Sequence, residues 1–464
     1  MQHFLKNICN ISEAINPRDS LFGGRTNAIK MYYKVSPGEK INYVDFRSLY
    51  PDRQKYGIYP LGHPEIITEN FKNVEEYFGL IKCKILPPRG LFLPVLPVRI
   101  KGKLFFPLCH LCASEGQQKC DHSDEQRAIE GTWVSLEIKE ALNQGYKIIS
   151  IFEVWHYPLT TQYDPIAKKG GLFTSYVNLF LKFKEEASGY PDNVNTEAEK
   201  EEYINKFFEK EGIWLNRDNI KHNPGIRSVM KLMLNSFWGR FGMQTNKTQV
   251  KYITKLVDWY ALIEDDRYII HDISMEIPDV LIVYYSQNSK SDDGGNSVNQ
   301  INVVIASFVT CQARLKLLDI MQKLGKRVIY HDTDSIIYSA RPGDYEPKLG
   351  DHLGDLTNEI AKADGSHIVE IVCGGPKNYA YITDSGASKC VVKGFSLSVT
   401  TNLKLNFDSI KEIVCCDRTA QISVDQLKFK RCKNDWSIST SVIKKLYSFI
   451  YDKRAMIDHY ETLP

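Results

Sequence analysis

The residues best placed for chemistry are aspartates that stand beside runs of β-forming residues. The segment VIYHDTDSIIY, residues 328–338, sets Asp332 and Asp334 between two such runs and predicts a β-hairpin with an acidic tip. Because side chains two residues apart on extended backbone face the same side, the two carboxylates are expected to converge. Their repulsion would favour a cation between them, whereas a solvated acidic turn is the simpler interpretation.

A third carboxylate, Asp45, lies at the end of an apolar run in YVDFRSLYP, residues 43–51. Pro51 predicts that regular structure breaks there. Taken alone, Asp45 is equally suited to cap the next helix or turn. Together, Asp45, Asp332 and Asp334 form a set of oxygen ligands of the kind that hard divalent cations such as Mg²⁺ prefer.

A different set of metal ligands, Cys109, Cys112, Cys120 and His122, has the spacing C-x₂-C-x₇-C-x-H. Thiolates with an imidazole suit tetrahedral Zn²⁺, and C-x₂-C is the usual first pair of such sites. The final C-x-H spacing is unusual, and His110 competes as the fourth ligand. The sequence therefore leaves two interpretations open, a structural zinc site or reduced cysteines in an ordered loop.

Residues 223–242, NPGIRSVMKLMLNSFWGRFG, predict an amphipathic helix that begins after Asn223 with a proline at its first position. One face carries two cations, an amide and an aromatic ring, which could hold a triphosphate and stack on a base. These residues are Arg227, Lys231, Asn235 and Trp238. The opposite face, expected to pack in a core, carries Met230, Met233, Leu234 and Phe237. A plain surface helix is the alternative.

The pattern of apolar residues and turn formers indicates the elements that hold these residues in place. Extended chain is expected over 30–50, short strands and loops over 61–165, and a polar loop over 285–300. Further helices are expected over Leu172–Ala187 and Val304–Leu324. No motif anchors residues 406–464.

Composition limits the class of protein. A chain of 464 residues with 43% apolar and 25% charged residues is long enough for several subdomains. The net charge is only +3, but seven Lys or Arg and no Asp or Glu lie between Lys221 and Lys255, a stripe suited to a phosphate backbone or simply to solvent. No apolar run could span a bilayer and no secretory signal is evident, so an intracellular protein with no membrane partner is expected. Eleven cysteines without such a signal predict a reducing compartment.

In their order along the chain, these segments resemble the motifs of family B DNA polymerases. The motif D-x-x-S-L-Y-P is matched by Asp45, Ser48, Leu49, Tyr50 and Pro51. The finger-helix motif K-x-x-x-N-S-x-Y-G is matched by Lys231, Asn235, Ser236 and Gly239, with Trp238 in place of the usual Tyr. The motif Y-x-D-T-D-S is matched by Tyr330, Asp332, Thr333, Asp334 and Ser335. Lys377 and Tyr379 resemble the K-x-Y element, and Lys393–Gly394 the K-G element.

The resemblance, which covers residues 20–464, extends to the protein-primed members. About 185 residues separate Asp45 from Lys231, which leaves room for the large insertion of those enzymes. LFGGRTNA, residues 21–28, resembles their glycine-pair connector, although Leu21 stands where they have a Tyr. GTWVSLEIKEALNQGYK and FPLCHLC are most similar to polymerases of Polinton/Maverick-type transposons and related viruses.

The resemblance implies an α+β fold shaped like a right hand, with an antiparallel palm sheet, helical fingers, insertion subdomains and a small thumb. Residues 1–29 would be a connector and 30–60 the first part of the palm. Residues 61–165 would form an insertion like the terminal-protein region of those enzymes. The fingers would occupy 166–243, a second insertion and loop 244–300, the rest of the palm 301–395, and the thumb 396–464.

It also implies a mechanism, in which a primer hydroxyl attacks the α-phosphate of a dNTP with the help of two Mg²⁺ ions. Asp45 and Asp334 would be the principal metal ligands, and Asp332 would assist them. Tyr50 would exclude a 2′-hydroxyl. Nucleotide contacts are implied for Ser48, Leu49, Tyr50, Arg227, Lys231, Asn235 and Trp238. Contacts with primer–template DNA are implied for Tyr330, Thr333, Lys377, Tyr379, Lys393 and Gly394.

Residues 1–29 are too few for the proofreading domain that precedes the polymerase in full family members, so no 3′–5′ exonuclease activity is expected. A terminal protein that primes replication is an expected partner. One alternative is an inactive transposon relic that binds DNA. A reverse transcriptase would show Y-x-D-D instead and lacks the finger-helix motif. A non-enzymatic zinc module would leave the carboxylates and the Lys231 helix without a purpose.

Overall fold

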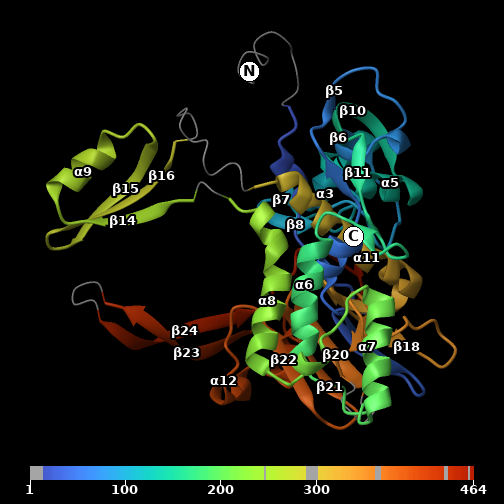
Figure 1. Ribbon diagram of the computed structural model, residues 1–464. Coiled ribbons are helices and arrows are strands. Elements are labelled where there is room, and N and C mark those ends of the chain that lie inside the picture. Colours follow the sequence, from blue (N-terminus) through green and yellow to red (C-terminus); the bar gives the residue numbers. More distant parts are fainter. Residues whose placement is uncertain (1–13, 245–246, 289–300, 361–366, 433–436, 458–459) are drawn as a thin grey trace.

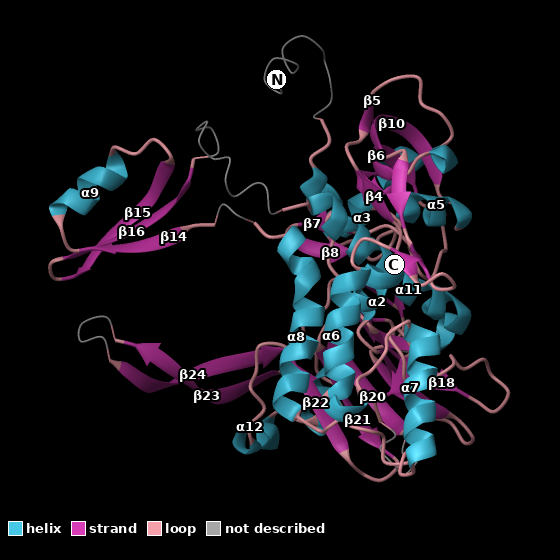
Figure 2. Cartoon of the chain, in the orientation of Figure 1, coloured by secondary structure: helices cyan, strands magenta, loops and turns pink. Residues whose placement is uncertain are grey.

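The computed structural model describes residues 14–244, 247–288, 301–360, 367–432, 437–457 and 460–464. Figures 1 and 2 show upright helices beside a central sheet, a smaller sheet above it, and two β-rich arms that extend to one side. None of the described helices is both long and apolar enough to cross a membrane.

The central sheet is antiparallel and joins segments from both halves of the chain. In spatial order its strands are β1 (Thr26–Ala28), β17 (Val328–Asp332), β18 (Ser335–Ala340), β3 (Lys40–Phe46), β20 (Ile368–Gly375), β21 (Asn378–Thr383) and β22 (Ser388–Val392). Two short strands, β19 (Leu356–Asn358) and β2 (Tyr32–Lys34), pair with β3 and β20. The expected hairpin around Asp332 is β17–β18, and β3 pairs with its second strand.

The sheet is buried on both faces, because a separate apolar core covers each one. Val44 and Phe46 of β3 belong to the core that contains the long helix α11 (Val303–Leu324). Ile41 belongs to the other core, together with α13 (Phe407–Cys415). This two-sided burial holds the strands that carry the aspartates in one register.

Helix α11 follows the expectation from the sequence closely, whereas helix α2 differs from it. Helix α11 matches the expected range to within one residue. The prediction that regular structure breaks at Pro51 is wrong, because helix α2 (Leu49–Tyr56) continues through this residue. Proline is tolerated in the first helical turn, where its missing N–H has no partner to lose.

The first insertion packs a four-stranded sheet against α11. In spatial order its strands are β5 (Glu65–Ile67), β10 (Lys147–His156), β6 (Gly79–Leu86) and β9 (Ile129–Val134). Helix α5 (Ser135–Asn143) lies between β9 and β10 in the chain, and its Glu137 receives two hydrogen bonds of 2.7 and 2.9 Å from the buried guanidinium of Arg314 on α11. Between β6 and β9 lie the hairpin β7 (Val98–Ile100)–β8 (Lys103–Phe105) and the short helices α3 (His110–Glu115) and α4 (Asp124–Arg127).

The upright helices are α6 (Thr174–Glu186), α7 (Glu197–Glu211) and α8 (Pro224–Phe241). Helices α6 and α8 were expected, and the core face expected for α8 is confirmed in part, since Met230 and Phe237 are partly buried and Phe237 packs against a core cluster. Of the four residues assigned to it, only Leu234 is buried, and Met233 is 37% exposed. Helix α8 packs mainly on α6, so only a narrow stripe of its apolar side chains is covered by the rest of the protein.

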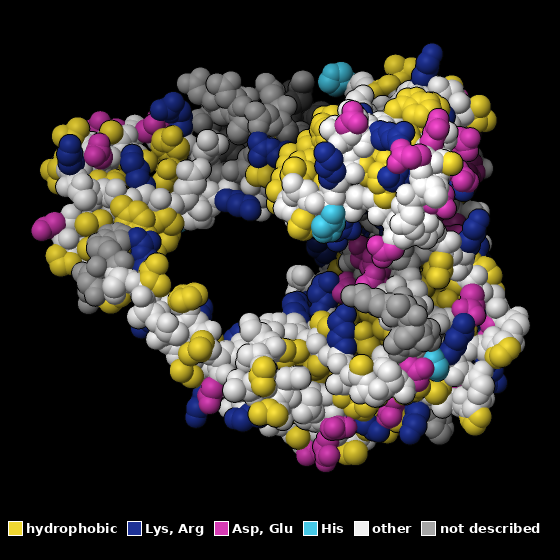
Figure 3. Space-filling model, turned by 60° about the horizontal axis from the view of Figure 1, so that its bottom comes forward, with side chains coloured by type: hydrophobic (Ala, Val, Ile, Leu, Met, Phe, Trp, Pro, Cys, Tyr) yellow, Lys and Arg dark blue, Asp and Glu magenta, His cyan; other side chains and the backbone are white. Residues whose placement is uncertain are grey.

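Two arms extend from the body. One is a three-stranded sheet of β14 (Gln249–Ile253), β16 (Val280–Gln287) and β15 (Tyr268–Ile277) with helix α9 (Leu256–Ile263). The other is the long hairpin β23 (Gln421–Arg431)–β24 (Ile438–Ser448), which follows α12 (Val399–Lys404) and α13. Their ends meet where Arg431 lies 5.9 Å from the ring centroid of Tyr252, and Figure 3 shows an opening enclosed beside the body.

The prediction of a loop over 285–300 is wrong at its start, because strand β16 continues through Gln287. Residues 289–300 lie outside the described part of the chain. The chain ends with β25 (Ala455–Met456) and β26 (Thr462–Leu463), which pair with each other. Minor strands β4 (Tyr59–Leu61) and β11 (Leu159–Thr161) form one ribbon, and β12 (Tyr163–Asp164) and β13 (Lys169–Gly170) form another.

Candidate active site

The hairpin tip places Asp332 and Asp334 differently from the extended strand that the sequence suggested. Strand β17 ends at Asp332 and β18 begins at Ser335, so Asp334 lies in the turn. Thr333 between them has φ +61°, and the Asp334 N–H donates to the Asp332 carbonyl at 2.6 Å. The predicted convergence on one strand face is therefore wrong, because the backbone reverses between the two residues.

Strand β3 brings Asp45 to Asp334. Asp45 pairs with Ser335, and the Phe46 N–H donates to the Asp334 carbonyl at 2.8 Å. Burial and the nearby Asp334 charge raise the pKa of Asp45 to about 7. Burial and the Asp332 charge raise the pKa of Asp334 to about 6. The pair thus concentrates negative charge that protein cations only partly balance, which is an environment that favours a bound cation.

Asp332 is paired with a lysine instead. The Lys377 Nζ donates to both carboxylate oxygens of Asp332 at 2.8 Å, and the Thr26 hydroxyl donates to one of them at 2.8 Å. In the described part of the chain, the three aspartates do not form a group of ligand atoms within 4.8 Å of one another. The site is therefore an open pair of carboxylates with a third held beside it.

Three connector residues to which the sequence assigned no role in the site, Gly24, Arg25 and Thr26, support it. A Cβ on Gly24 would lie 2.7 Å from the Thr333 side chain, so only glycine allows this close approach. The Thr333 N–H donates to the Arg25 carbonyl at 2.8 Å, and Thr26 pairs with Asp332 across β1 and β17. The glycine pair Gly23–Gly24 was visible in the sequence, but the contact of Gly24 with the hairpin was not.

Arg314 on helix α11 holds the same connector, because it donates to the carbonyls of Phe22 and Gly23 at 2.7 and 3.0 Å.

A fourth residue, Glu359, adds negative charge near Asp45. Together with burial and Asp334, it raises the pKa of Asp45. Its backbone N–H donates to the Tyr43 carbonyl at 2.9 Å, which fixes it beside β3. No motif or spacing in the sequence identified Glu359.

Of the residues on the predicted polar face of helix α8, Lys231 is the one whose charge acts on the carboxylates. Lys231 is exposed, and its charge opposes the rise that burial causes in the pKa of both Asp45 and Asp334. Arg227 donates from Nε to the Ser188 hydroxyl at 3.1 Å, and Asn235 is exposed. The Trp238 ring stacks on Tyr50, with centroids 4.6 Å apart and an interplanar angle of 23°.

The residues that precede and begin α2 differ in what they can contact. Ser48 stands at the N-cap position with φ +57° and makes no side-chain capping hydrogen bond, and Leu49 is buried at 1% exposure. Tyr50 is partly buried against Trp238, and burial raises its pKa to about 12. Tyr50 and Trp238 together form an aromatic wall between α2 and α8.

The residues predicted to contact DNA differ in burial. Tyr330 is 1% exposed, too buried to touch DNA itself; its hydroxyl accepts the Lys377 N–H at 2.8 Å and so positions that lysine. Tyr379 lies 4.8 Å from Tyr330 between ring centroids and is also buried. Lys377, Lys393 and Gly394 are exposed, and the Lys393 N–H donates to the Lys377 carbonyl at 2.9 Å.

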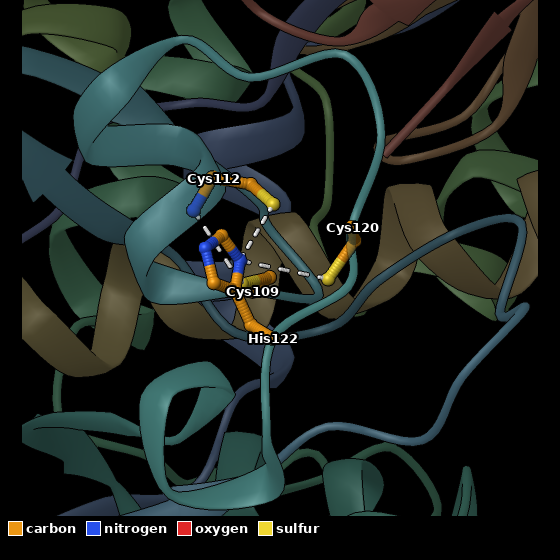
Figure 4. A group of neighbouring side chains, drawn as sticks. All are labelled: Cys109, Cys112, Cys120 and His122. Carbon is orange, nitrogen blue, oxygen red and sulfur yellow. Dashed lines mark hydrogen bonds between the residues drawn. The ribbon is translucent and has the colours of Figure 1, made fainter.

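The four predicted zinc ligands come together elsewhere, in the first insertion. One ligand atom each from Cys109, Cys112, Cys120 and His122 lies within 4.8 Å of the others, as Figure 4 shows; we call this group the Cys/His cluster. The competing His110 is exposed and lies 3.4 Å from the Ser114 hydroxyl instead. The Cys/His cluster is the only group of three or more potential metal ligands in the described ranges.

Comparison with known proteins supports one interpretation of this geometry. The family described as DNA polymerase type B, organellar and viral, matches residues 7–200 and 195–308. A probable DNA polymerase of Neurospora intermedia is 23% identical over 428 residues, which are 89% of this chain and 35% of that protein. A probable DNA polymerase of Podospora anserina is 26% identical over 387 residues, covering 78% of this chain and 26% of that protein. The chain thus spans about a third or less of these relatives.

Solved structures show a similar fold. Phi29 DNA polymerase complexed with primer-template DNA and incoming nucleotide substrates matches 94% of this chain and 62% of its own, with a TM-score of 0.54 and 13% identity. Its post-translocation binary complex with primer-template DNA gives a TM-score of 0.53 and 15% identity, with the same coverage. The predicted α+β polymerase fold is therefore confirmed.

Proposed function

The chain belongs to the family of organellar and viral type B DNA polymerases, and on that premise we propose that it extends a primer on a DNA template by two-metal-ion catalysis. The observation that carries the proposal is the juxtaposition of Asp45 and Asp334 on adjacent backbone segments below the polar face of α8. Asp45 is on β3, Asp334 is in the β17–β18 turn and Lys231 is on α8, so these three residues come together only when the central sheet has formed.

The two carboxylates fit divalent cations by their chemistry. Both are hard oxygen ligands, and burial with mutual repulsion leaves them short of positive charge. Two Mg²⁺ ions held there would stabilise the attacking primer oxygen and the leaving pyrophosphate oxygens. Asp45 and Asp334 are assigned as their principal ligands. Asp332 assists by holding Lys377 at the edge of the site.

The other side chains bind and orient the substrates. Lys231, whose charge acts on the carboxylates, and Arg227, one turn before it on α8, would bind the triphosphate. Their fixed positive charge would lower the barrier as negative charge develops. The stacked Tyr50–Trp238 pair would border the sugar and the new base pair. Lys377 and Lys393, exposed on neighbouring turns, would hold the primer backbone.

We extend the proposal to the partners. Phi29 DNA polymerase is known in complex with primer-template DNA and nucleotides. The opening beside the body in Figure 3, enclosed by the three-stranded sheet and the long hairpin, is the proposed path for DNA. The resemblance to protein-primed polymerases adds a terminal protein as the proposed primer.

The test is extension of a labelled primer–template with Mg²⁺ and dNTPs by the wild type and by an Asp45→Asn/Asp334→Asn double variant. Asp319→Asn, a partly exposed aspartate on α11, is the matched control. Extension by wild type and control, but not by the double variant, would support the proposal. No extension by a folded wild type that binds DNA would favour a catalytically inactive relic.

A further inference from the structure

The loop that carries the Cys/His cluster has almost no apolar core. From Leu108 to Gln126, Cys109 is the only buried residue, and no residue of α3 is buried. Such a segment cannot be held by apolar burial, since it removes little apolar surface from water. It nevertheless has an ordered fold, with α3 ending at Gly116 in the left-handed conformation and a capping box from Ser123 beginning α4. Small units of this kind commonly depend on a metal or disulfides.

The distances within the cluster match a tetrahedral metal site. His122 Nδ1 lies 3.4 Å from Cys109 Sγ, 3.2 Å from Cys112 Sγ and 3.9 Å from Cys120 Sγ, and all four groups point toward one another in Figure 4. Zinc bonds of about 2.3 Å to sulfur and 2.0–2.1 Å to nitrogen at tetrahedral angles place S and N about 3.6 Å apart. The Cys112 N–H also donates to Cys109 Sγ at 3.4 Å.

We propose that Cys109, Cys112, Cys120 and His122 bind one Zn²⁺ as a closed structural site. Three soft sulfur ligands and an imidazole select zinc over the hard cations that suit the aspartates. Four protein ligands fill the tetrahedron and leave no position for substrate, so the ion has a structural role, separate from polymerisation.

The surrounding contacts hold the ligand segments in position. Buried Arg127 donates to the carbonyls of Pro87 and Leu108 at 2.7 and 3.4 Å, the second of which directly precedes Cys109. Arg89 donates to the His122 carbonyl at 2.8 Å. These two arginines fix both ends of the ligand loop, and the metal would fix its middle.

The zinc loop also supports the C-terminal segment of the chain. Gln118, between the second and third cysteines, accepts the Met456 N–H at 3.0 Å. A cavity of about 390 Å³ lies between the three cluster cysteines and residues 451–455. Further along, the Thr462 N–H donates to the Ile29 carbonyl at 3.1 Å beside strand β1. The site therefore connects the first insertion, through the C-terminal segment, to the edge of the central sheet that carries Thr26.

The experiment is metal analysis of the full chain, purified reduced and without chelator or histidine tag. One zinc ion per chain is expected, and Co²⁺ exchanged for it should give the visible absorption of tetrahedral cobalt thiolate. Cys112→Ser/Cys120→Ser should lose the metal, whereas Cys415→Ser/Cys416→Ser, a second pair of cysteines outside the cluster, should keep it. His122→Cys should also keep it, because a fourth thiolate is a competent ligand.

A measurement on the wild type keeps the proposal testable if the double variant does not fold. Alkylation followed by mass mapping should find the three cluster cysteines protected until a chelator is added, while exposed Cys416 reacts at once. The proposal is overturned by a folded, reduced wild type that takes up no added zinc, or by cluster cysteines that react equally with and without chelator.

Discussion

The carboxylate site and the Cys/His cluster are both suited to metal ions, but the chain builds them in opposite ways. Asp45 and Asp334 are brought together by strand pairing across the whole central sheet, between two large cores. The cluster comes from one short loop with almost no core. The aspartates form an open pair, whereas the cluster offers four ligands that converge on one point. The difference indicates that one site must leave room for substrate, while the other substitutes for missing apolar packing.

The largest expected effect tests whether the carboxylates serve catalysis rather than folding. Asp334→Asn should lower primer extension by about 10³-fold, because it removes a charge that acts in the transition state. The melting temperature should stay within about 2 °C of wild type, since a repulsive charge is removed and the shape is kept. Extension assays and thermal unfolding of the same preparations measure both quantities. A large loss of stability with activity retained per folded molecule would reverse the comparison.

The second effect tests whether the cluster serves folding. Removal of zinc with a chelator should lower the melting temperature by several degrees, because the ligand loop has no core to replace the metal. Hydrogen exchange should increase at the Met456 amide, which is bonded to the zinc loop, but not at the Phe46 amide beside the aspartates. Equal exchange at Met456 with and without the metal would contradict the link between the two segments.

The third effect is a pH dependence confined to the carboxylate site. Asp45 and Asp334 have pKa values of about 7 and about 6 in the folded chain, above the ordinary 3.8. At these two groups the folded chain therefore binds more protons than the unfolded chain, so their contribution to the stability of the metal-free protein should fall as the pH rises from about 4 to about 7. Mg²⁺ binds the ionised carboxylates, and the stabilisation it gives should consequently grow over the same range.

Thermal unfolding with and without Mg²⁺ at pH 5.5 and pH 8 measures this effect. The increase in melting temperature caused by Mg²⁺ should be larger at pH 8, and Asp45→Asn should reduce the difference. A shift of the same size at both pH values would show that the ion binds elsewhere.

The comparison also explains which features the sequence could predict. Helix α11, the β17–β18 hairpin and the Cys/His cluster depend on residues near one another in the chain, and local spacing identified them. The contact of Gly24 with Thr333 and the place of Glu359 beside Asp45 join segments that are about 300 residues apart. Periodicity carries no information about such pairs. The geometry of the hairpin tip was also missed, because the positive φ of Thr333 is not what its residue type favours.

The smallest expected effect concerns the reason why the carboxylate site is open. The Lys377–Asp332 pair keeps the third aspartate occupied, but the lysine side chain is 53% exposed, so the pair contributes at most about 1 kcal/mol. Lys377→Gln should therefore change the rate of primer extension by less than about tenfold.

The substitution has two expected effects of opposite sign. Asp332 becomes free to approach the metal, which should lower the Mg²⁺ concentration for half-maximal extension. Loss of a cation near the primer should raise the KM for primer–template. Lys389→Gln, an exposed lysine on nearby β22, should change neither quantity. If Lys377→Gln leaves the Mg²⁺ requirement unchanged, the ion pair does not limit access of Asp332 to the metal, and the openness of the site must come from the reversed backbone at Thr333 alone.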